Sequence, residues 1–207
     1  MDFPDKFDKT TRSLPVKLGQ VAAEAVKKLA DQGYEVQLGL TPELASQILT
    51  MSKEPSIREF CPKDCSQRFA DRAATERWLQ KGRAAFVLLK KDGDNYRLAG
   101  YGWAGPASSE HAPGGTTTFA IRIGEAGQGQ GLAAPFSWLI IAGTAVLFES
   151  RDFWLETWGS NGGAVHVYHK IGFKTVDEEP DERPTPDGQK VSDTRVYMSL
   201  DNKLLPG

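Results

Sequence analysis

Gly124–Ala133, with the sequence GEAGQGQGLA, stands between a strand-like stretch and a long apolar run. Glycines let a backbone approach a ligand closely, and the start of a helix offers unpaired N–H groups with partial positive charge. The stretch therefore predicts a loop that holds a pyrophosphate, in preference to a glycine-rich turn without a ligand. Residues 129–134 also fit the dinucleotide fingerprint, with acids downstream at Asp152 and Glu156, so two ligand classes remain open.

The apolar run that follows, residues 132–148, contains no charged side chain. A membrane-spanning helix needs about 20 apolar residues, and this shorter run also includes Pro135 and Gly143. We interpret it as a helix buried in the core; a membrane span is the less favoured alternative. We expect no membrane partner.

Periodicity and turn signals predict the other elements. They are an amphipathic helix from 14 to 33, a strand at 34–40, a helix from 42, an irregular segment at 53–70, a helix at 71–81, a hairpin of 84–91 and 97–103, a loop at 106–115, strands at 116–123 and 153–158, a helix at 161–170, a strand at 173–176, an acidic Pro-rich loop at 177–193 and a last strand at 194–200. Residues 1–13 are expected to fray. This order indicates a mixed α/β (α+β) domain at 34–200, with an N-terminal extension at 1–33 and a tail at 201–207. The order contains one central βαβ unit, whereas a Rossmann domain needs several parallel units.

Composition limits the function classes. The chain has 207 residues, 40% hydrophobic, and a formal net charge of -2. It can therefore bury a core, and it is not built mainly to neutralise nucleic acid. Its two cysteines, Cys61 and Cys65, have no second pair or nearby histidine, so we expect reduced thiols and no metal site. The N-terminus has no apolar leader segment, which favours a cytoplasmic protein.

Two motifs carry a family resemblance. Gln128–Ala133, QGQGLA, matches the Gln/Arg-x-x-Gly-x-Gly/Ala signature of the GCN5-related N-acetyltransferase superfamily. Downstream, residues 155–173, LETWGSNGGAVHVYHKIGF, resemble the second half of the same pattern, most of all in its ribosomal-protein alanine N-acetyltransferase branch. The motifs cover about 117–174, and the element order extends the resemblance to about 34–200.

The resemblance implies a single twisted sheet of six or seven strands flanked by helices. It also implies acetyl-CoA as cosubstrate, lying between strands 116–123 and 153–158. The residues implied to bind it are Ile123, through its backbone to the pantetheine arm; Gln128, Gly129, Gln130, Gly131, Leu132 and Ala133, through backbone N–H groups to the pyrophosphate; and Asn161. The acceptor groove would be formed by 53–70 and 177–193.

The expected reaction is direct attack of a primary amine on the thioester. An alkyl ammonium must first lose a proton, and the departing thiolate benefits from a proton donor. Tyr168 shares a helix face with Asn161 and Ala164 and is the candidate acid. Glu156, in the strand FWLETW, is the candidate base if it is buried with a raised pKa; the equal alternative is an outward-facing strand acid.

Other function classes stay open at this stage. They are a non-catalytic acyl-CoA-binding module and, less favoured, a dinucleotide-binding oxidoreductase. The acceptor is either a small-molecule amine or a protein N-terminus. The apolar helix and the N-terminal helix together suggest surplus apolar surface, from which we predict a homodimer.

Overall fold

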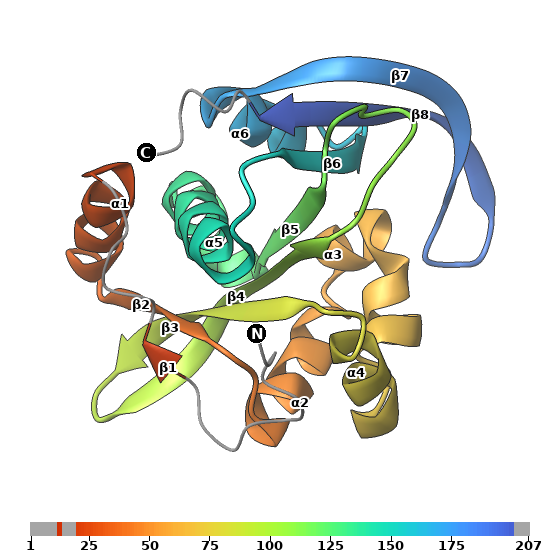
Figure 1. Cartoon of the computed structure of the whole chain (residues 1–207). Helices are drawn as coiled ribbons and strands as arrows, with labels where there is room; N and C mark the ends of the chain where they lie inside the picture. The colour runs from red at the N-terminus through yellow and green to blue at the C-terminus, as the bar shows by residue number, and fades with distance from the viewer. Residues whose placement is uncertain (1–11, 14–19, 201–207) are drawn as a thin grey trace.

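The structure, a computed structural model, describes residues 12–13 and 20–200. Its centre is one eight-stranded sheet in the order β1-β2-β3-β4-β5-β6-β8-β7 (Figure 1). The strands are β1 (Arg12–Ser13), β2 (Tyr34–Leu38), β3 (Ala84–Asp92), β4 (Asn95–Pro106), β5 (Thr117–Ile123), β6 (Phe153–Trp158), β7 (Phe173–Pro184) and β8 (Lys190–Leu200). The two-residue β1 is an addition to the predicted six or seven strands.

The sheet separates at its middle. Every neighbouring pair is antiparallel except β5 and β6, which are parallel and joined only at Thr117–Phe153 and Thr118–Trp154. Beyond these pairs the two strands diverge, so the far edge of β5 has no neighbouring strand from Phe119 onward. The predicted gap between strands 116–123 and 153–158 is therefore present in the fold.

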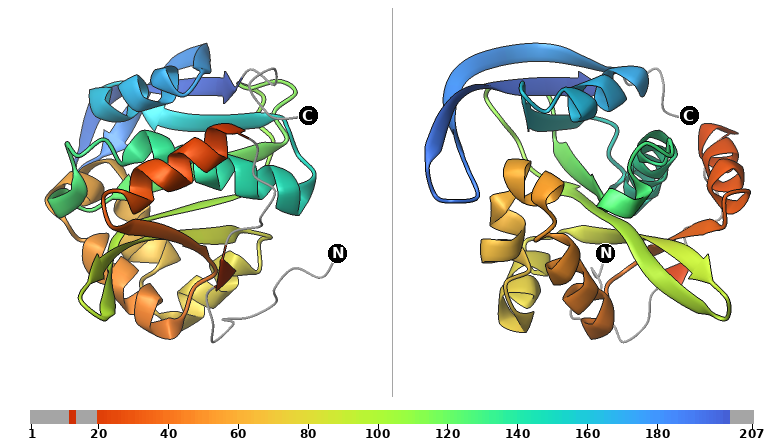
Figure 2. Two further views of the ribbon diagram at one scale, coloured as in Figure 1. Left: turned by 90° about the vertical axis from the view of Figure 1, so that its left-hand side faces the viewer. Right: turned by 180° about the vertical axis from the view of Figure 1, so that it is seen from behind.

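Helices cover both faces of the sheet (Figures 1 and 2). One face packs against α1 (Gln20–Ala30), α5 (Ala133–Phe148) and α6 (Gly162–Lys170), and α1 lies along α5. The other face packs against α2 (Pro42–Met51), α3 (Pro55–Phe60), the π-helix η1 (Asp64–Arg68) and α4 (Arg72–Leu79). The sheet thus divides the core into two apolar layers that meet only at its edges and at the gap.

The apolar run forms α5 and is buried, as predicted. It lies directly against β4, where a Cβ added to Gly102 would stand 2.5 Å from Cδ1 of Ile140 and 2.7 Å from the carbonyl oxygen of Ala120. Only glycine permits this close approach of helix and sheet. Within residues 12–13 and 20–200, no helix has both the length and the apolarity to cross a bilayer.

Two segments predicted to be irregular are ordered. Residues 53–70 contain α3 and η1, the first begun by Pro55 at the first helical position, where the missing N–H costs nothing. Residues 177–193 are mostly strand: β7 continues to Pro184, and only 185–189 remain for the turn to β8. Pro180 is tolerated because β7 is the last strand of the sheet, where an N–H on the outer side has no ladder partner.

The N-terminal predictions are met in part. The amphipathic helix is present as α1 over 20–30, and residues 14–19 of the predicted helix lie outside the described residues. Arg12 and Ser13 were expected to fray, but they pair with Leu38 and Gln37 of β2. The division into 1–33, 34–200 and 201–207 remains a prediction.

Candidate active site

A glycine loop lies at the open end of the gap, between β5 and α5. Gly129 and Gly131 have φ values of +75° and +72°, a backbone region that glycine adopts without strain. A Cβ added at either position would meet no atom within 4 Å, so open space adjoins both residues. The loop therefore presents bare backbone to an approaching ligand.

The start of α5 adds donors to this loop. Its cap residue, Leu132, gives no side-chain hydrogen bond to the first turn, and the first turn has no acidic residue. The leading N–H groups of a helix that lacks such a cap are free for an anion. The Leu132 side chain is buried in the core, so its contribution to a ligand is limited to its backbone. Within 128–133, the N–H groups of Gly129, Gly131, Leu132 and Ala133 make no backbone hydrogen bond among the described residues and fit a pyrophosphate.

Two glutamine side chains hold the loop in shape. Gln128 donates through Nε2 to the carbonyl oxygen of Ile123 at 3.1 Å and to Oγ of Ser56 at 2.9 Å. Gln130 donates to the carbonyl oxygen of Ala126 at 2.7 Å and accepts from the Tyr34 hydroxyl at 2.9 Å. Their backbone N–H groups also bond within the loop, Gln128 to the carbonyl oxygen of Glu125 and Gln130 to that of Gly127. Both glutamines therefore support the loop, and the N–H groups of Gly129 and Gly131 remain as its possible ligand contacts.

The backbone of Ile123 points into the gap. Gly124 donates its N–H to Ala99 on β4, at 2.9 Å, and successive residues of a strand direct their backbone groups to opposite sides. The polar groups of Ile123 and Ile121 therefore face β6. This is the edge that the sequence resemblance assigns to the pantetheine arm, although the Gln128 side chain bonds to the Ile123 carbonyl here.

Tyr168 reaches the gap from α6. Its ring packs edge-on against Phe119 of β5, with ring centres 5.8 Å apart, and lies 6.1 Å from Phe173. Burial raises the pKa of its hydroxyl to about 12, and the positive charge of Arg122 acts in the opposite direction. With this pKa the hydroxyl is protonated at neutral pH. It makes no hydrogen bond to any residue that the structure describes, so it is available to a ligand.

Asn161 has a local role. It caps α6 by accepting a hydrogen bond at Oδ1 from the N–H of Ala164, at 3.3 Å. This bond fixes the first turn of the helix that carries Tyr168. Whether Asn161 also contacts a cosubstrate remains a prediction.

Glu156 is not the buried carboxylate that one interpretation required. Its side chain is 49% exposed and pairs with Arg195 of β8 at 3.6 Å. The alternation of strand side chains explains this position. Phe153 and Leu155 point into the α5 layer, and Glu156, the residue after Leu155, points to the opposite face. The outward-facing alternative is the one found.

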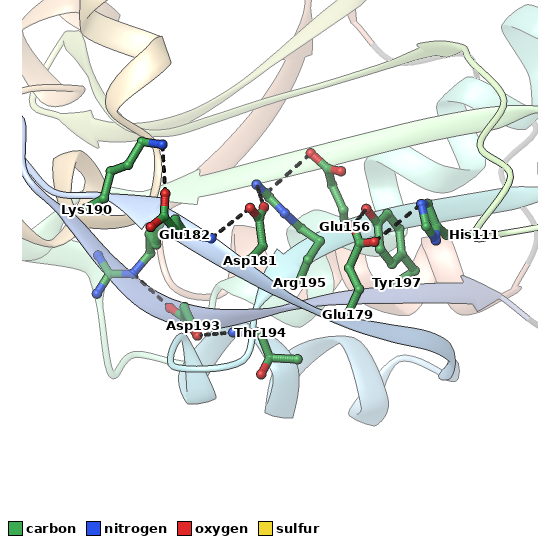
Figure 3. A network of polar contacts seen from close by, with 11 residues as sticks. His111, Glu156, Glu179, Asp181, Glu182, Lys190, Asp193, Thr194, Arg195 and Tyr197 are labelled. Carbon is green, nitrogen blue, oxygen red and sulfur yellow. Dashed lines mark hydrogen bonds and ion pairs between the residues drawn. The ribbon is translucent and has the colours of Figure 1, made fainter.

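Glu156 belongs to a charged network on β6, β7 and β8 (Figure 3). Arg195 also pairs with Asp181 at 3.1 Å and lies over the Trp158 ring at 3.5 Å. Further along, the Tyr197 hydroxyl donates to Glu179 at 2.7 Å. This set of residues, the outer network, offers half-exposed acids on the face opposite α5.

A second charged group was missed by sequence reasoning. Arg122 of β5 donates through Nε to Asp64 of η1 at 3.1 Å, and the Asp64 side chain is completely buried. Asp64 also accepts from the Tyr101 hydroxyl at 2.8 Å and from Arg68 at 2.6 Å. The available signal was one arginine in the otherwise uncharged strand TTTFAIRI. We call Asp64, Arg68, Tyr101 and Arg122 the buried cluster.

The two segments expected to form the acceptor groove do meet. Arg183 of β7 donates to the carbonyl oxygen of Glu59 at 3.0 Å and lies over the Phe60 ring at 4.9 Å. Arg58 donates to the carbonyl oxygen of Pro186, in the turn between β7 and β8, at 2.7 Å. Helix α3 and the β7–β8 hairpin therefore form one wall on the face that carries Glu156.

Comparisons with known proteins identify the architecture. No family model matches the sequence, and no curated protein matches it. Solved structures do match. Spermidine N-acetyltransferase from Vibrio cholerae, in complex with CoA and spermine, has a TM-score of 0.63 at 17% identity and covers 84% of this chain and 99% of its own.

Two further structures agree. An N-acetyltransferase from Staphylococcus aureus has a TM-score of 0.63 at 17% identity, over 82% of this chain and 98% of its own. AAC(6')-Ib, in complex with paromomycin and acetyl-CoA, has a TM-score of 0.57 at 20% identity, over 83% of this chain and 95% of its own. The divided sheet, the glycine loop and these likenesses together show that the chain has the fold of the GCN5-related N-acetyltransferases.

Proposed function

We propose that the protein is an acetyl-CoA-dependent N-acetyltransferase that acetylates a primary amine by direct attack. The observation that carries the proposal is the gap between β5 and β6, with the glycine loop at its open end and the Tyr168 ring packed against Phe119, the first residue of β5 beyond its last pair with β6. The structural neighbours support it, since their bound molecules include CoA and acetyl-CoA.

The cosubstrate would be held by backbone. Within residues 128–133, the N–H groups of Gly129, Gly131, Leu132 and Ala133 would bind its pyrophosphate. The polar edge of Ile121 and Ile123 would pair with the pantetheine arm. For the second contact, the Gln128 amide must leave the Ile123 carbonyl or share it. When bound, acetyl-CoA supplies the acetyl group as a thioester.

Two side chains would move the protons. Tyr168, with a pKa near 12, is protonated at neutral pH and would donate its hydroxyl proton to the departing sulfur. Glu156 would accept the amine proton, through water because its carboxylate is half-exposed. Both assignments come from the resemblance and remain proposals.

The acceptor class is a further part of the proposal. Neighbouring structures contain spermine and paromomycin, which favours a small-molecule amine over a protein N-terminus. The likeness of residues 155–173 to ribosomal-protein alanine N-acetyltransferases points to the second choice. An acetylation screen over polyamines, aminoglycosides, amino acids and peptide N-termini separates them.

Ligand-dependent stability tests the cosubstrate. Acetyl-CoA at a hundred times its Kd should stabilise the fold by about 2.7 kcal/mol, and NADH should not. Gly131→Glu places a carboxylate beside the expected pyrophosphate and should abolish the shift. Gly188→Glu is the matched control, because Gly188 also has a positive φ, +86°, and open space around it, in the distant β7–β8 turn.

The same experiment separates the alternatives. A shift with acetyl-CoA but no thiol release with any amine would indicate a binding module. A shift with NADH alone would indicate a dinucleotide-binding protein and contradict the proposal. We also propose a cytoplasmic homodimer; light scattering at the 22.7 kDa monomer mass would contradict the dimer.

A further inference from the structure

Arg122 contacts the edge of β5 that borders the gap. Its Nη1 donates to the carbonyl oxygen of Ile121 at 2.7 Å. That oxygen faces β6, because the alternation set by Gly124 directs the backbone groups of Ile121 away from β4. The guanidinium therefore lies at the edge along which the pantetheine arm is proposed to run.

The buried cluster holds this guanidinium in place. Asp64 binds Nε, and the ring of Trp103 lies 4.9 Å from the guanidinium carbon. Asp64 is itself held by a hydrogen bond from the Tyr101 hydroxyl. Burial and the negative charge of Asp64 raise the pKa of Tyr101 well above its usual value, so this hydroxyl stays a donor. A charge that is already oriented needs little reorganisation when a reaction creates an opposite charge beside it.

The buried cluster contains one more positive charge than negative charges. Arg68 and Arg122 share the single carboxylate of Asp64, so one positive charge is not balanced within it. Arg68 is 31% exposed, so solvent can screen its charge, whereas Arg122 is 14% exposed and its charge is costly unless a partner or a ligand offsets it. Nη2 of Arg122 has no hydrogen bond among the described residues and is not sealed from solvent, so its N–H groups are free to meet one.

The charge of Arg122 also acts on Tyr168. Burial raises the pKa of the Tyr168 hydroxyl, and the positive charge of Arg122 is the group that lowers it. Burial would lower the pKa of Arg122, but Cys61, Asp64, Tyr101 and Tyr168 together keep it above its usual value. Arg122 is therefore charged at every working pH, and it is close enough to Tyr168 for their charges to interact.

We propose that Arg122 is the fixed positive charge that stabilises the CoA sulfur as it leaves. This inference rests on the proposed function. The amine nitrogen forms a bond to the acetyl carbon, and the carbon–sulfur bond breaks with its electron pair passing to sulfur. The sulfur leaves as a thiolate that the Arg122 charge and a hydrogen bond from the Tyr168 hydroxyl stabilise, and the amine proton passes to Glu156 or to water. Tyr168 and Arg122 thus stabilise the same leaving group, one by a hydrogen bond and the other by its charge.

The test measures the thiol of bound CoA directly, without turnover. A free thiol has a pKa of about 8.5, and a neighbouring cation lowers such a value by about one to three units. Ultraviolet titration of the wild-type complex with CoA should show this decrease once the titration of the same protein without CoA is subtracted, because Arg122 also acts on the pKa of the Cys61 thiol. Arg122→Gln should return the pKa of the bound thiol to its solution value or above, and Arg122→Lys should restore part of the decrease.

Two further variants keep the test interpretable. Arg122→Gln leaves Asp64 with one partner fewer, so the double variant Asp64→Asn/Arg122→Gln is measured as well, because it removes both buried charges together. Arg83→Gln is the matched control: Arg83 is also an arginine, it precedes β3, and it donates to the carbonyl oxygen of Pro106 at 3.2 Å. The thiol pKa should be unchanged in this control.

The outcomes separate the inference from the function on which it rests. Equal thiol pKa values in the wild type, Arg122→Gln and the double variant overturn the inference while CoA binding stands. An equal increase in Arg83→Gln also overturns it, since the effect would then be one of overall charge. Failure of wild-type protein to bind CoA overturns the proposed function first. Once the acceptor amine is identified, kcat of Arg122→Gln should be about tenfold or more below that of the wild type, with little change in KM for the amine.

Discussion

The two walls of the gap carry their charges in different ways. On the β4–β5 side, Asp64 is completely buried and each of its oxygens is bound by a donor. On the β6–β8 side, the carboxylates of Glu156 and Asp181 are 49% and 40% exposed and share Arg195 (Figure 3). One wall is a rigid electrostatic element, and the other is a hydrated, adaptable surface.

The difference follows from what covers each wall. Helices α2 and α4 and η1 close over β4 and β5 and leave an aromatic layer in which Phe69, Trp78, Tyr101 and Trp103 contact one another. Charge in such a layer must be paired or it destabilises the fold. Among residues 12–13 and 20–200, α3 is the helix on the corresponding face of β7, and the side chains of Glu156 and Asp181 there remain 49% and 40% exposed, so water screens their charges.

The largest expected effect comes from the buried wall. Asp64→Ala leaves Arg122 and Arg68 without their shared carboxylate and the Tyr101 hydroxyl without its acceptor. Breaking a buried ion pair from one side typically costs about 3–5 kcal/mol of stability. Denaturant unfolding of the purified variant measures this loss.

The exposed wall supplies the control for that prediction. Asp181→Ala removes one carboxylate from Arg195 on a surface where solvent screens the pair, so the free energy of unfolding should hardly change. Equal losses in Asp64→Ala and Asp181→Ala would show that the two walls do not differ in this way.

The next effect concerns the residue that lies between the walls. Tyr168→Phe should lower kcat at least about tenfold and keep the affinity for CoA. Stability should be nearly unchanged, because the hydroxyl has no hydrogen bond among the described residues. Since its pKa is about 12, the wild-type rate should show no loss of the proton donor between pH 7 and 10. Steady-state kinetics over this range measures both effects. If Tyr168→Phe keeps the full wild-type kcat, Tyr168 has a structural role and is not the proton donor.

Glu156 should give a smaller change. Its carboxylate is half-exposed, so water can replace part of its work, and Glu156→Gln should lower kcat/KM by about tenfold or less. Steady-state kinetics with the identified acceptor measures this loss. Asp181→Asn removes the other carboxylate on Arg195 and should keep the wild-type kcat/KM. Equal kcat/KM in the wild type and Glu156→Gln would assign the base to a water chain.

The centre of the fold could be predicted from the sequence because its signals are local. The glycine loop, the uncharged run of α5 and the strand FWLETW each lie in one continuous stretch with a clear pattern. The glycines of 128–133 also take the left-handed conformations that the loop needs. Local patterns of this kind need no knowledge of distant residues.

The walls could not be predicted, because they depend on pairing between distant residues. Residues 177–184 look like a loop until β8 lies beside them, and Asp177, Glu179 and Asp181 then pair in register with Tyr197, Arg195 and Asp193. Asp64 and Arg122 are 58 positions apart, so no spacing rule links them. Burial of Glu156 was undecided for the same reason: the direction of a strand side chain depends on which face the helices cover.

The smallest expected effect is a pH-dependent contact at the edge of the outer network. Nδ1 of His111, in the loop after β4, lies 2.8 Å from Asp177 of β7, and its ring stacks on Tyr197 at 4.3 Å. Glu179 and Glu110 also face the ring, at 3.7 and 3.8 Å. The hydrogen bond to Asp177 is the main cause of the raised pKa of His111.

The sign of the pH dependence follows from these shifts. A pKa raised in the folded state stabilises the fold fully below the unfolded value, here 6.5, and the contribution is lost as pH rises through the higher folded value. The pKa of Asp177 is lowered from 3.8 mainly by the same hydrogen bond, so its contribution is lost as pH falls through that lower value. The contact should therefore stabilise the fold most between about pH 4 and 6.5 and fade above that range. Denaturant unfolding of the wild type and His111→Gln across pH 5 to 9 measures it. The difference between the two proteins should be largest at the acid end and shrink as pH rises, and a constant difference would show that His111 acts by stacking on Tyr197 alone.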